Sequence, residues 1–328
     1  MKKYTFLPLL ASALLSTQAH SFDLTDVTWT PGQIINSPAG QTYNVYGNYQ
    51  NSGTINTASF VNFMPGSRYT SYAGSMVNNL AGGQIYLSSG STVTYEVGSG
   101  FRNHSGATVV NDATIINKGV SIFDEGSSVT GTGSYTQVDG GSLIVNGTFT
   151  QTGGIYITGN AYLGGSGTIN GSVYASGSDV IIAPGNSPGH LTINGDLKLE
   201  NGAKLVMQVY SLTDFDKISV TGSFDLGASR ILFDVKPELK ATFVEQFTFN
   251  DFFEKIDGAG AAHAPDIALF SQVSFEYGDA TTAPTAGGNL VDINKMVPSV
   301  PEPESYAMAL AGLGLIGAVA RRRKSMIA

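Results

Sequence analysis

Few residues in this chain have types and spacing that could support catalysis. Residues 185–189 (Gly-Asn-Ser-Pro-Gly) match the Gly-x-Ser-x-Gly pattern of a serine nucleophile elbow. An elbow needs a helix after the serine and a backbone N–H on the next residue, but Pro188 has no N–H. The residues after it alternate between apolar and polar, as in a strand. We therefore interpret this segment as a turn.

The histidines give no sign of a metal site. They are far apart, and none forms the spaced His–His or His–Glu pair typical of zinc enzymes. The four are His20, His104, His190 and His263. Absence of cysteine excludes a thiolate metal site, a cysteine nucleophile and a disulfide scaffold. The sequence thus predicts no metal, no cofactor and no catalytic residue.

A polysaccharide lyase or glycosidase is an alternative that would need carboxylates gathered on one face. The Gly-rich part of the chain offers Asp112, Asp124, Glu125, Asp139 and Asp179, with three basic residues, Arg68, Arg102 and Lys118. Further on, Asp214 and Asp216 could share a strand face and bind Ca²⁺, but no full calcium-binding repeat accompanies them. We expect solvated or turn-capping carboxylates and no enzyme.

A binding module for ice or glycan is the other alternative. Ice binding would need a regular threonine lattice, but the pairs Thr92/Thr94 and Thr148/Thr150 are not one coil apart in the sequence, so no array is expected. Tyrosines could stack on sugars or form the wall of the fold. They are Tyr43, Tyr46, Tyr49, Tyr69, Tyr72, Tyr156 and Tyr174.

Short alternating apolar segments separated by Gly and Asn turns position all these residues. Leu143, Val145 and Phe149 alternate with polar neighbours, and period two indicates strands with one buried face. Gly147, Gly159 and Gly171 each begin a strand-turn unit of about twelve residues, and Gly195 follows at the doubled spacing of about 24. Such units predict an all-β fold, a parallel β-solenoid, with an antiparallel sandwich as the alternative.

Charge divides the body near residue 195. Residues 22–195 hold eight acidic and three basic residues, and residues 196–300 hold 15 and eight. Stacked coils need little charge, because like charges would form unfavourable ladders. The net charge of −8 for the whole chain argues against nucleic-acid partners.

One segment resembles a known surface-protein repeat. Pro184-Gly185-Asn186-Ser187-Pro188-Gly189 is a six-residue turn between strands, and Asp214-Phe215-Asp216-Lys217 follows it. Residues 165–225 are similar to the repeat of autotransporter passengers, which implies a β-helix. We therefore expect a solenoid over residues 22–210, a small β-rich cap over 211–280 and a linker over 281–299.

The N-terminal end is typical of a secretory signal peptide over residues 1–21. Lys2 and Lys3 precede an apolar run, and small residues at Ala19 and Ser21 offer cleavage sites. This order predicts export by the Sec machinery.

The C-terminal end combines three features in a fixed order. Pro301-Glu302-Pro303 precedes an apolar run over residues 306–320, and Arg321-Arg322-Arg323 follows it. The run predicts a short transmembrane helix whose basic flank stays in the cytoplasm. Residues 300–328 resemble the PEP-CTERM sorting signal of Gram-negative bacteria, whose tail also carries an "ice-binding protein C-terminal" label.

That resemblance implies processing by an exosortase near Pro301, Glu302 and Pro303. It also implies an inner-membrane precursor, followed by release or transfer of the body to the cell surface or extracellular matrix. We therefore expect a structural or adhesive envelope protein associated with exopolysaccharide or biofilm.

Overall fold

The computed structural model describes residues 20–185, 188–225, 229–239 and 249–255. The chain divides into two compact units, Met1–Leu290 and Val291–Ala328, and every described residue belongs to the first. The expected linker, the sorting motif at 301–303, the transmembrane helix at 306–320 and the arginines at 321–323 lie outside the described residues. So do residues 1–19 of the expected signal peptide and His263.

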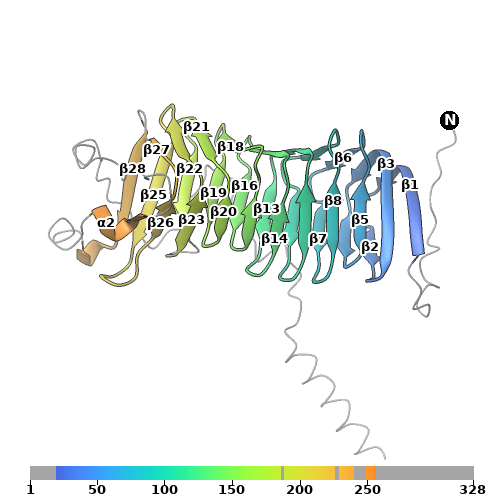
Figure 1. The fold of residues 1–328 in the computed structure, drawn as a ribbon, viewed down its shortest axis with the longest axis horizontal. Coiled ribbons are helices and arrows are strands. Elements are labelled where there is room, and N and C mark those ends of the chain that lie inside the picture. The colour runs from blue at the N-terminus through green and yellow to red at the C-terminus, as the bar shows by residue number, and fades with distance from the viewer. Residues whose placement is uncertain (1–19, 186–187, 226–228, 240–248, 256–328) are drawn as a thin grey trace, which may run out of the picture. The chain divides into compact units, whose positions relative to one another are not determined.

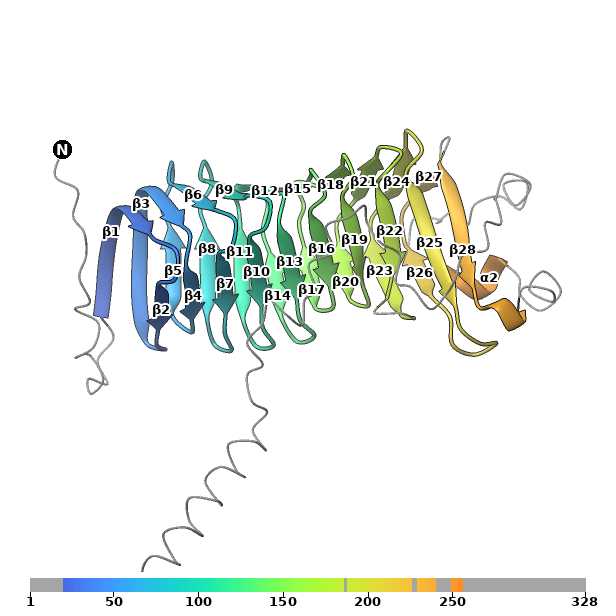
Figure 2. The same cartoon turned by 180° about the vertical axis from the view of Figure 1, so that it is seen from behind.

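The described residues form a parallel β-solenoid, as predicted (Figures 1 and 2). Each coil contributes three strands, and each strand pairs in parallel with its counterpart one coil away; for example Leu143 lies opposite Leu163. Face 1 is a ten-stranded sheet. Its strands are β2 (Ile34–Ser37), β4 (Thr54–Thr57), β7 (Met76–Asn79), β10 (Gly100–Asn103), β13 (Val120–Phe123), β16 (Ser142–Val145), β19 (Tyr162–Gly165), β22 (Ile181–Pro184), β25 (Lys204–Val209) and β28 (Arg230–Val235).

Faces 2 and 3 belong to a second sheet of 19 strands. The long strands β1 (His20–Trp29) and β3 (Gln41–Asn51) run along both faces, because β3 pairs with strands of each. Face 2 continues with β5 (Phe60–Phe63), β8 (Gln84–Leu87), β11 (Thr108–Asn111), β14 (Ser128–Thr130), β17 (Thr148–Thr150), β20 (Thr168–Asn170), β23 (His190–Asn194), β26 (Lys217–Val220) and β29 (Phe253–Lys255). Face 3 continues with β6 (Arg68–Ser71), β9 (Thr92–Tyr95), β12 (Thr114–Asn117), β15 (Ser134–Gln137), β18 (Ile155–Thr158), β21 (Val173–Ser176), β24 (Leu197–Glu200) and β27 (Phe224–Asp225).

One apolar core runs along the axis between the three faces. Alternate residues of each strand point inward, which is the period-two pattern of the sequence. The first coils are filled by an aromatic stack whose neighbouring ring centroids are 4.9–5.8 Å apart. It consists of Tyr49, Tyr69, Tyr95, Phe101, Phe123 and Phe149. Later coils are filled mainly by Leu, Ile and Val side chains that are fully buried.

Coil length agrees only in part with the expected unit of twelve residues that doubles to 24. Thr168 pairs with Thr192, 24 residues on, whereas Thr148 pairs with Thr168, 20 residues on, so successive coils differ in length. Gly147, Gly159 and Gly171 follow β16, β18 and β20, so they lie at three different corners. Their regular spacing therefore reflects the distance between turns and not the coil.

The parallel ladder continues beyond residue 210, where the sequence placed the start of a cap. Strands β26, β28 and β29 pair in parallel with β23, β25 and β26. Two short helices, η2 (Pro237–Leu239) and α2 (Phe249–Phe252), follow β28. Phe252 of α2 is buried against Phe215 and Phe233, so α2 packs on the last described coil.

Candidate functional site

The outward side chains of face 2 include a column of hydroxyl groups that sequence reasoning missed. In-register pairing aligns Thr108, Ser128, Thr148, Thr168 and Thr192 on five successive coils. Parallel strands lie ~4.8 Å apart, so the hydroxyls repeat at that interval. We had expected no threonine array. The two threonine pairs do lie on different faces, since Thr92 is on face 3, but the register places Thr148 beside Thr168 and so forms a column of hydroxyl groups that we had not predicted.

A second column on face 2 carries hydroxyl and amide groups that bond to one another. The Asn170 side-chain amide donates a hydrogen bond of 2.9 Å to the Thr150 hydroxyl, and the Asn194 side-chain amide donates one of 2.8 Å to Asn170 Oδ1. Thr130 begins this column and is exposed. The face therefore presents neutral hydrogen-bonding groups in two rows.

Face 3 carries a pair of exposed tyrosines on adjacent coils. Tyr156 of β18 lies opposite Tyr174 of β21, and their rings stack with centroids 5.4 Å apart and an interplanar angle of 18°. The two side chains are 39 % and 37 % exposed. Lys198 is the next residue in this column, and its ammonium group pairs with Glu200 at 2.6 Å.

The other tyrosines from the sequence divide between core and surface. Tyr43, Tyr49 and Tyr69 are buried, whereas Tyr46 and Tyr72 are exposed. Burial raises the pKa of Tyr69 to about 12. Sugars stack only on accessible rings, so the three buried tyrosines belong to the wall of the solenoid. The tyrosines that could contact a sugar are therefore the exposed ones.

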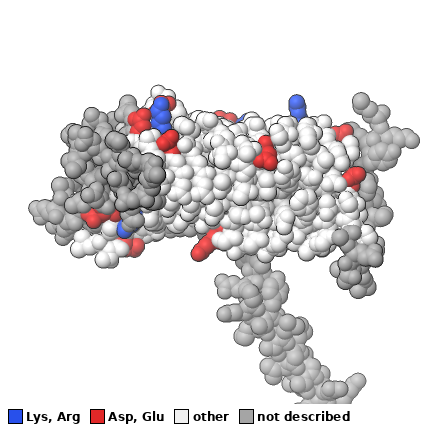
Figure 3. Space-filling model, in the orientation of Figure 1, with Lys and Arg blue, Asp and Glu red and all other residues white. Residues whose placement is uncertain are grey.

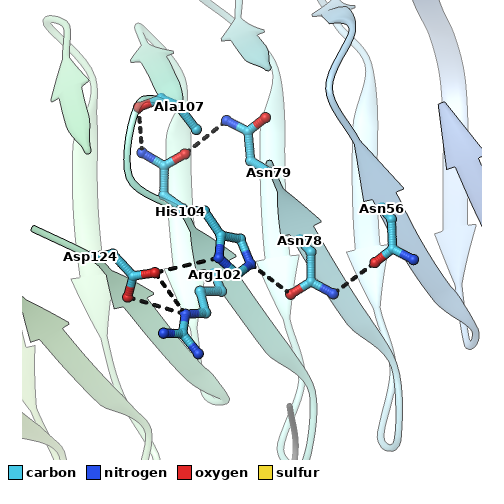
Figure 4. Close-up of polar contacts among 8 residues, drawn as sticks. Asn56, Asn78, Asn79, Arg102, His104, Ala107 and Asp124 are labelled. Atoms are coloured by element: carbon cyan, nitrogen blue, oxygen red, sulfur yellow. Dashed lines mark hydrogen bonds and ion pairs between the residues drawn. The ribbon is translucent and has the colours of Figure 1, made fainter. Parts of the chain in front are cut away.

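A polar cluster lies where β7, β10 and β13 end on face 1 (Figure 4). The Arg102 Nε atom donates to both Asp124 carboxylate oxygens at 3.1 and 2.9 Å. His104 lies 3.4 Å from Asp124 Oδ2 through Nδ1 and 3.4 Å from Asn78 Oδ1 through Nε2. The Asn78 side-chain amide in turn donates a hydrogen bond of 2.8 Å to Asn56 Oδ1. These contacts link successive coils.

Burial, with a smaller contribution from Arg102, lowers the pKa of His104, and Asp124 only partly offsets this. A neutral histidine beside a carboxylate could act as a general base. Here, however, Arg102 also engages the carboxylate, and Asn78 engages the second ring nitrogen. We interpret the cluster as a structural contact between coils.

The remaining carboxylates of the Gly-rich part each have separate roles. Asp112 accepts hydrogen bonds from the backbone N–H and hydroxyl of Thr132, and these bonds lower its pKa. Asp139 lies 3.8 Å from the Lys118 ammonium group. Glu125 and Asp179 are exposed. Within the described residues, no group of three His, Asp or Glu side chains is arranged to hold a metal ion.

Asp214 and Asp216 do not share a face as expected. Residues 210–214 form a turn, in which the N–H groups of Tyr210 and Ser211 bond to the Asp214 carbonyl oxygen. Asp214 is exposed there, whereas Asp216 is fully buried. Asp216 accepts bonds from the backbone N–H groups of Gly189 at 2.9 Å and Gln208 at 2.7 Å.

This carboxylate therefore fixes the end of the Gly-x-Ser-x-Gly segment. Residues 186 and 187 lie outside the described residues, and His190 begins a strand, β23, directly after Gly189. No helix follows the segment within the described residues, which agrees with a turn. His190 bonds to the Ser219 hydroxyl at 2.6 Å, and His20 is the first residue of β1.

The surface of the described residues is sparsely charged. Figure 3 shows few Lys, Arg, Asp and Glu side chains on the visible face of the solenoid. Hydroxyl, amide and tyrosine groups occupy most outward positions of faces 2 and 3. Such a surface can bind a neutral or weakly charged polar polymer through hydrogen bonds. Among the described residues no helix is long and apolar enough to cross a membrane.

Comparison with known proteins identifies one segment of the chain. Residues 299–324 match the PEP-CTERM protein-sorting motif. The match confirms the resemblance recognised at Pro301-Glu302-Pro303 and the basic end. No curated protein and no solved structure matches the chain.

Proposed function

We propose, from the PEP-CTERM sorting motif at residues 299–324, that this protein is a structural or adhesive component of the bacterial cell envelope or extracellular matrix. The motif implies that the chain is exported, is anchored in a membrane as a precursor and is processed by an exosortase. The body that is sorted in this way is a β-solenoid. The proposed role is non-enzymatic.

Exopolysaccharide is the proposed partner of the solenoid surface. A polysaccharide presents many hydroxyl groups, and the outward columns of faces 2 and 3 present hydroxyl, amide and tyrosine groups over several coils. The body is acidic, with 23 acidic and 11 basic residues between 22 and 300, so an acidic polymer would be held by hydrogen bonds or bridging cations. Repetition along both molecules would increase avidity.

The single observation that carries the proposal is the sorting motif, and fractionation of the native host tests it. Intact mass of the mature protein should lack the C-terminal helix when exosortase is present and retain it when the enzyme is deleted. The same mass would distinguish cleavage after Ala19 from cleavage after Ser21. Cleavage after Ala19 would leave β1 whole, whereas cleavage after Ser21 would remove its first two residues. A precursor that stays unprocessed in the membrane in both strains would contradict the sorting role.

Polysaccharide contact has its own test. Purified body should co-sediment with the host's exopolysaccharide, and Tyr156→Ala with Tyr174→Ala should weaken that binding while the circular dichroism spectrum stays unchanged. Tyr46→Ala is the matched control, because Tyr46 is equally exposed, at 37 %, but lies on β3 away from the pair. Equal loss in the control and the double variant would argue against a specific surface on face 3.

Ice is a second candidate ligand, and the hydroxyl column of face 2 is the observation that favours it. An ice-binding face would need Thr148 and Thr168 at its centre. Thermal hysteresis and ice-recrystallisation assays on the purified body would test this, with Thr148→Ala and Thr168→Ala expected to abolish any activity. Absence of both activities in the unchanged protein would remove this candidate.

A further inference from the structure

Face 1 differs from the other two faces because both sides of its central strands are buried. In β13, Ser121 and Phe123 point into the solenoid, so Val120 and Ile122 point outward. All four side chains are nevertheless buried. The same holds for the four residues of β16. On β11 and β15 the outward positions are only half-buried.

The buried outward residues form an apolar patch on the outside of face 1. We call it the face-1 patch; it consists of Val120, Ile122, Ile144, Ala183 and Val206, which are 3–9 % exposed. None of them belongs to the apolar core of the solenoid. In the column of Ile122, pairing places Ile144, Gly164 and Ala183 on the next coils. Thr, Ser and Asn occupy comparable positions on face 2.

Among the described residues, the ring of Tyr162 on β19 lies over Gly164, between Ile144 and Ala183, and covers the middle of this patch. Strands of face 1 contact mainly their neighbours in the ladder, and α2 contacts β26 and β29. A side chain that is at most 9 % exposed must nevertheless have a cover. β13 lies two ladder steps from β19, about 10 Å at ~4.8 Å each, so Tyr162 leaves Val120 and Ile122 to another cover.

Residues 256–290 follow β29 directly and close the first compact unit at Leu290. Extended, this segment would reach about 115 Å at ~3.3 Å per residue. The route from β28 to β13 crosses five ladder steps, or about 24 Å at ~4.8 Å each. The segment contains an alternating apolar set that suits one buried side. Its members are Ile267, Leu269, Val273, Phe275 and Tyr277.

We propose that residues 256–290 dock on the face-1 patch and cover it through these alternating apolar side chains. Docking removes a contiguous apolar area from water, which on an exported protein would otherwise promote aggregation. This inference is independent of the polysaccharide contact, which uses faces 2 and 3.

Site-specific photocrosslinking tests the occupant in the full-length chain. The photoreactive amino acid p-benzoylphenylalanine replaces Ile144 on face 1. The matched control replaces Ile116, an outward isoleucine of β12 on face 3. After irradiation and proteolysis, mass spectrometry identifies the peptide joined to each position. Circular dichroism checks that both variants fold, and Ile122 is the second site if the first variant does not.

We expect position 144 to join a peptide from residues 256–290 and position 116 to join none from that segment. Mixing ¹⁴N- and ¹⁵N-labelled chains before irradiation separates crosslinks within one chain from crosslinks between two. Mixed-label crosslinks at position 144 would show that a second copy covers the patch and would overturn the proposal. So would a crosslink to another segment, or a folded variant that forms no crosslink to residues 256–290 from either site.

Discussion

Asn79 and Asn103 are joined by a hydrogen bond of 2.7 Å between two fully buried side chains on adjacent coils. The Asn103 side-chain amide also donates to the backbone carbonyl oxygens of Ala107 and Ser128 at 3.2 Å each. A buried polar group without a partner costs more free energy than its hydrogen bond contributes. This pair therefore fixes the register of two coils at one corner.

Replacing Asn103 with alanine should lower the free energy of unfolding by about 2–3 kcal/mol, because buried acceptors and the Asn79 amide lose a partner. Asn194→Ala is the matched control. Asn194 also donates to an asparagine one coil away, at 2.8 Å, but that pair is exposed. We expect about 0.5 kcal/mol or less there. Urea unfolding followed by circular dichroism measures both. Equal losses would show that burial does not set the cost.

Asp216 should make stability depend on pH. Burial raises its pKa to about 7, although the N–H groups of Gln208 and Gly189 oppose the shift. Between about pH 4 and pH 7 the folded chain keeps a proton that the unfolded chain has released, so stability falls as the pH rises and this contribution is lost above the folded pKa. The slope is at most about 1.4 kcal/mol per pH unit.

Asp216→Asn should remove this component, since the asparagine does not titrate. Urea unfolding at pH 4.5, 6.0 and 7.5 would show it as a difference in slope between the variant and the unchanged protein. Asp214→Asn is the control, because Asp214 is exposed and two residues away, and it should keep the slope. If the unchanged protein and Asp216→Asn lose stability in parallel, the buried carboxylate is not the titrating group.

The architecture was predictable from the sequence because alternation is a local signal. Strands such as β16 and β17 are visible in Leu143, Val145 and Phe149, all of which are buried. Coil length was predictable only in part: the doubled spacing of about 24 residues fits some coils, but the length depends on which strands pair and varies from coil to coil. Thr168 lies closer along the chain to its partner Thr148 than to its other partner, Thr192. A fixed period therefore fails.

The same variation hid the candidate surfaces. To predict the hydroxyl column through Thr148, one must know the strand register. To predict the face-1 patch, one must know which strands are buried on both sides. The segment Ser142-Leu143-Ile144-Val145 partly indicates a strand that is buried on both sides, because three consecutive apolar residues do not fit a strand with one solvent-exposed face. The sorting motif, in contrast, is a linear sequence feature: it was recognised over residues 300–328 without any fold, and the family match covers residues 299–324.

Gly131 follows β14 in a conformation that other residues rarely adopt. Its φ is +140°, and a Cβ atom would lie 2.0 Å from the carbonyl oxygen of Asn111 on the previous coil. Gly131→Ala should therefore lower the free energy of unfolding by at least about 2 kcal/mol, since backbone strain and a steric clash add. Gly66→Ala is the control, with φ +80° and no atom within 4 Å of the added group. We expect about 1 kcal/mol there. Urea unfolding measures both variants. A similar loss of unfolding free energy in the two would contradict close stacking of the coils at this corner.

The sorting motif gives the last prediction. Changing Pro301, Glu302 and Pro303 together to alanine should block exosortase processing, so the full-length precursor accumulates in the membrane fraction of the native host. Pro298→Ala is the control, because it lies one residue before the matched motif and should leave processing unchanged. Fractionation with immunoblotting and intact mass provides the measurement. The solenoid lies far from the change in sequence, so protease resistance of the body should be equal in both variants. A triple variant that is processed as efficiently as the control would mean that recognition rests on the apolar and basic parts of the tail, including Arg321, Arg322 and Arg323.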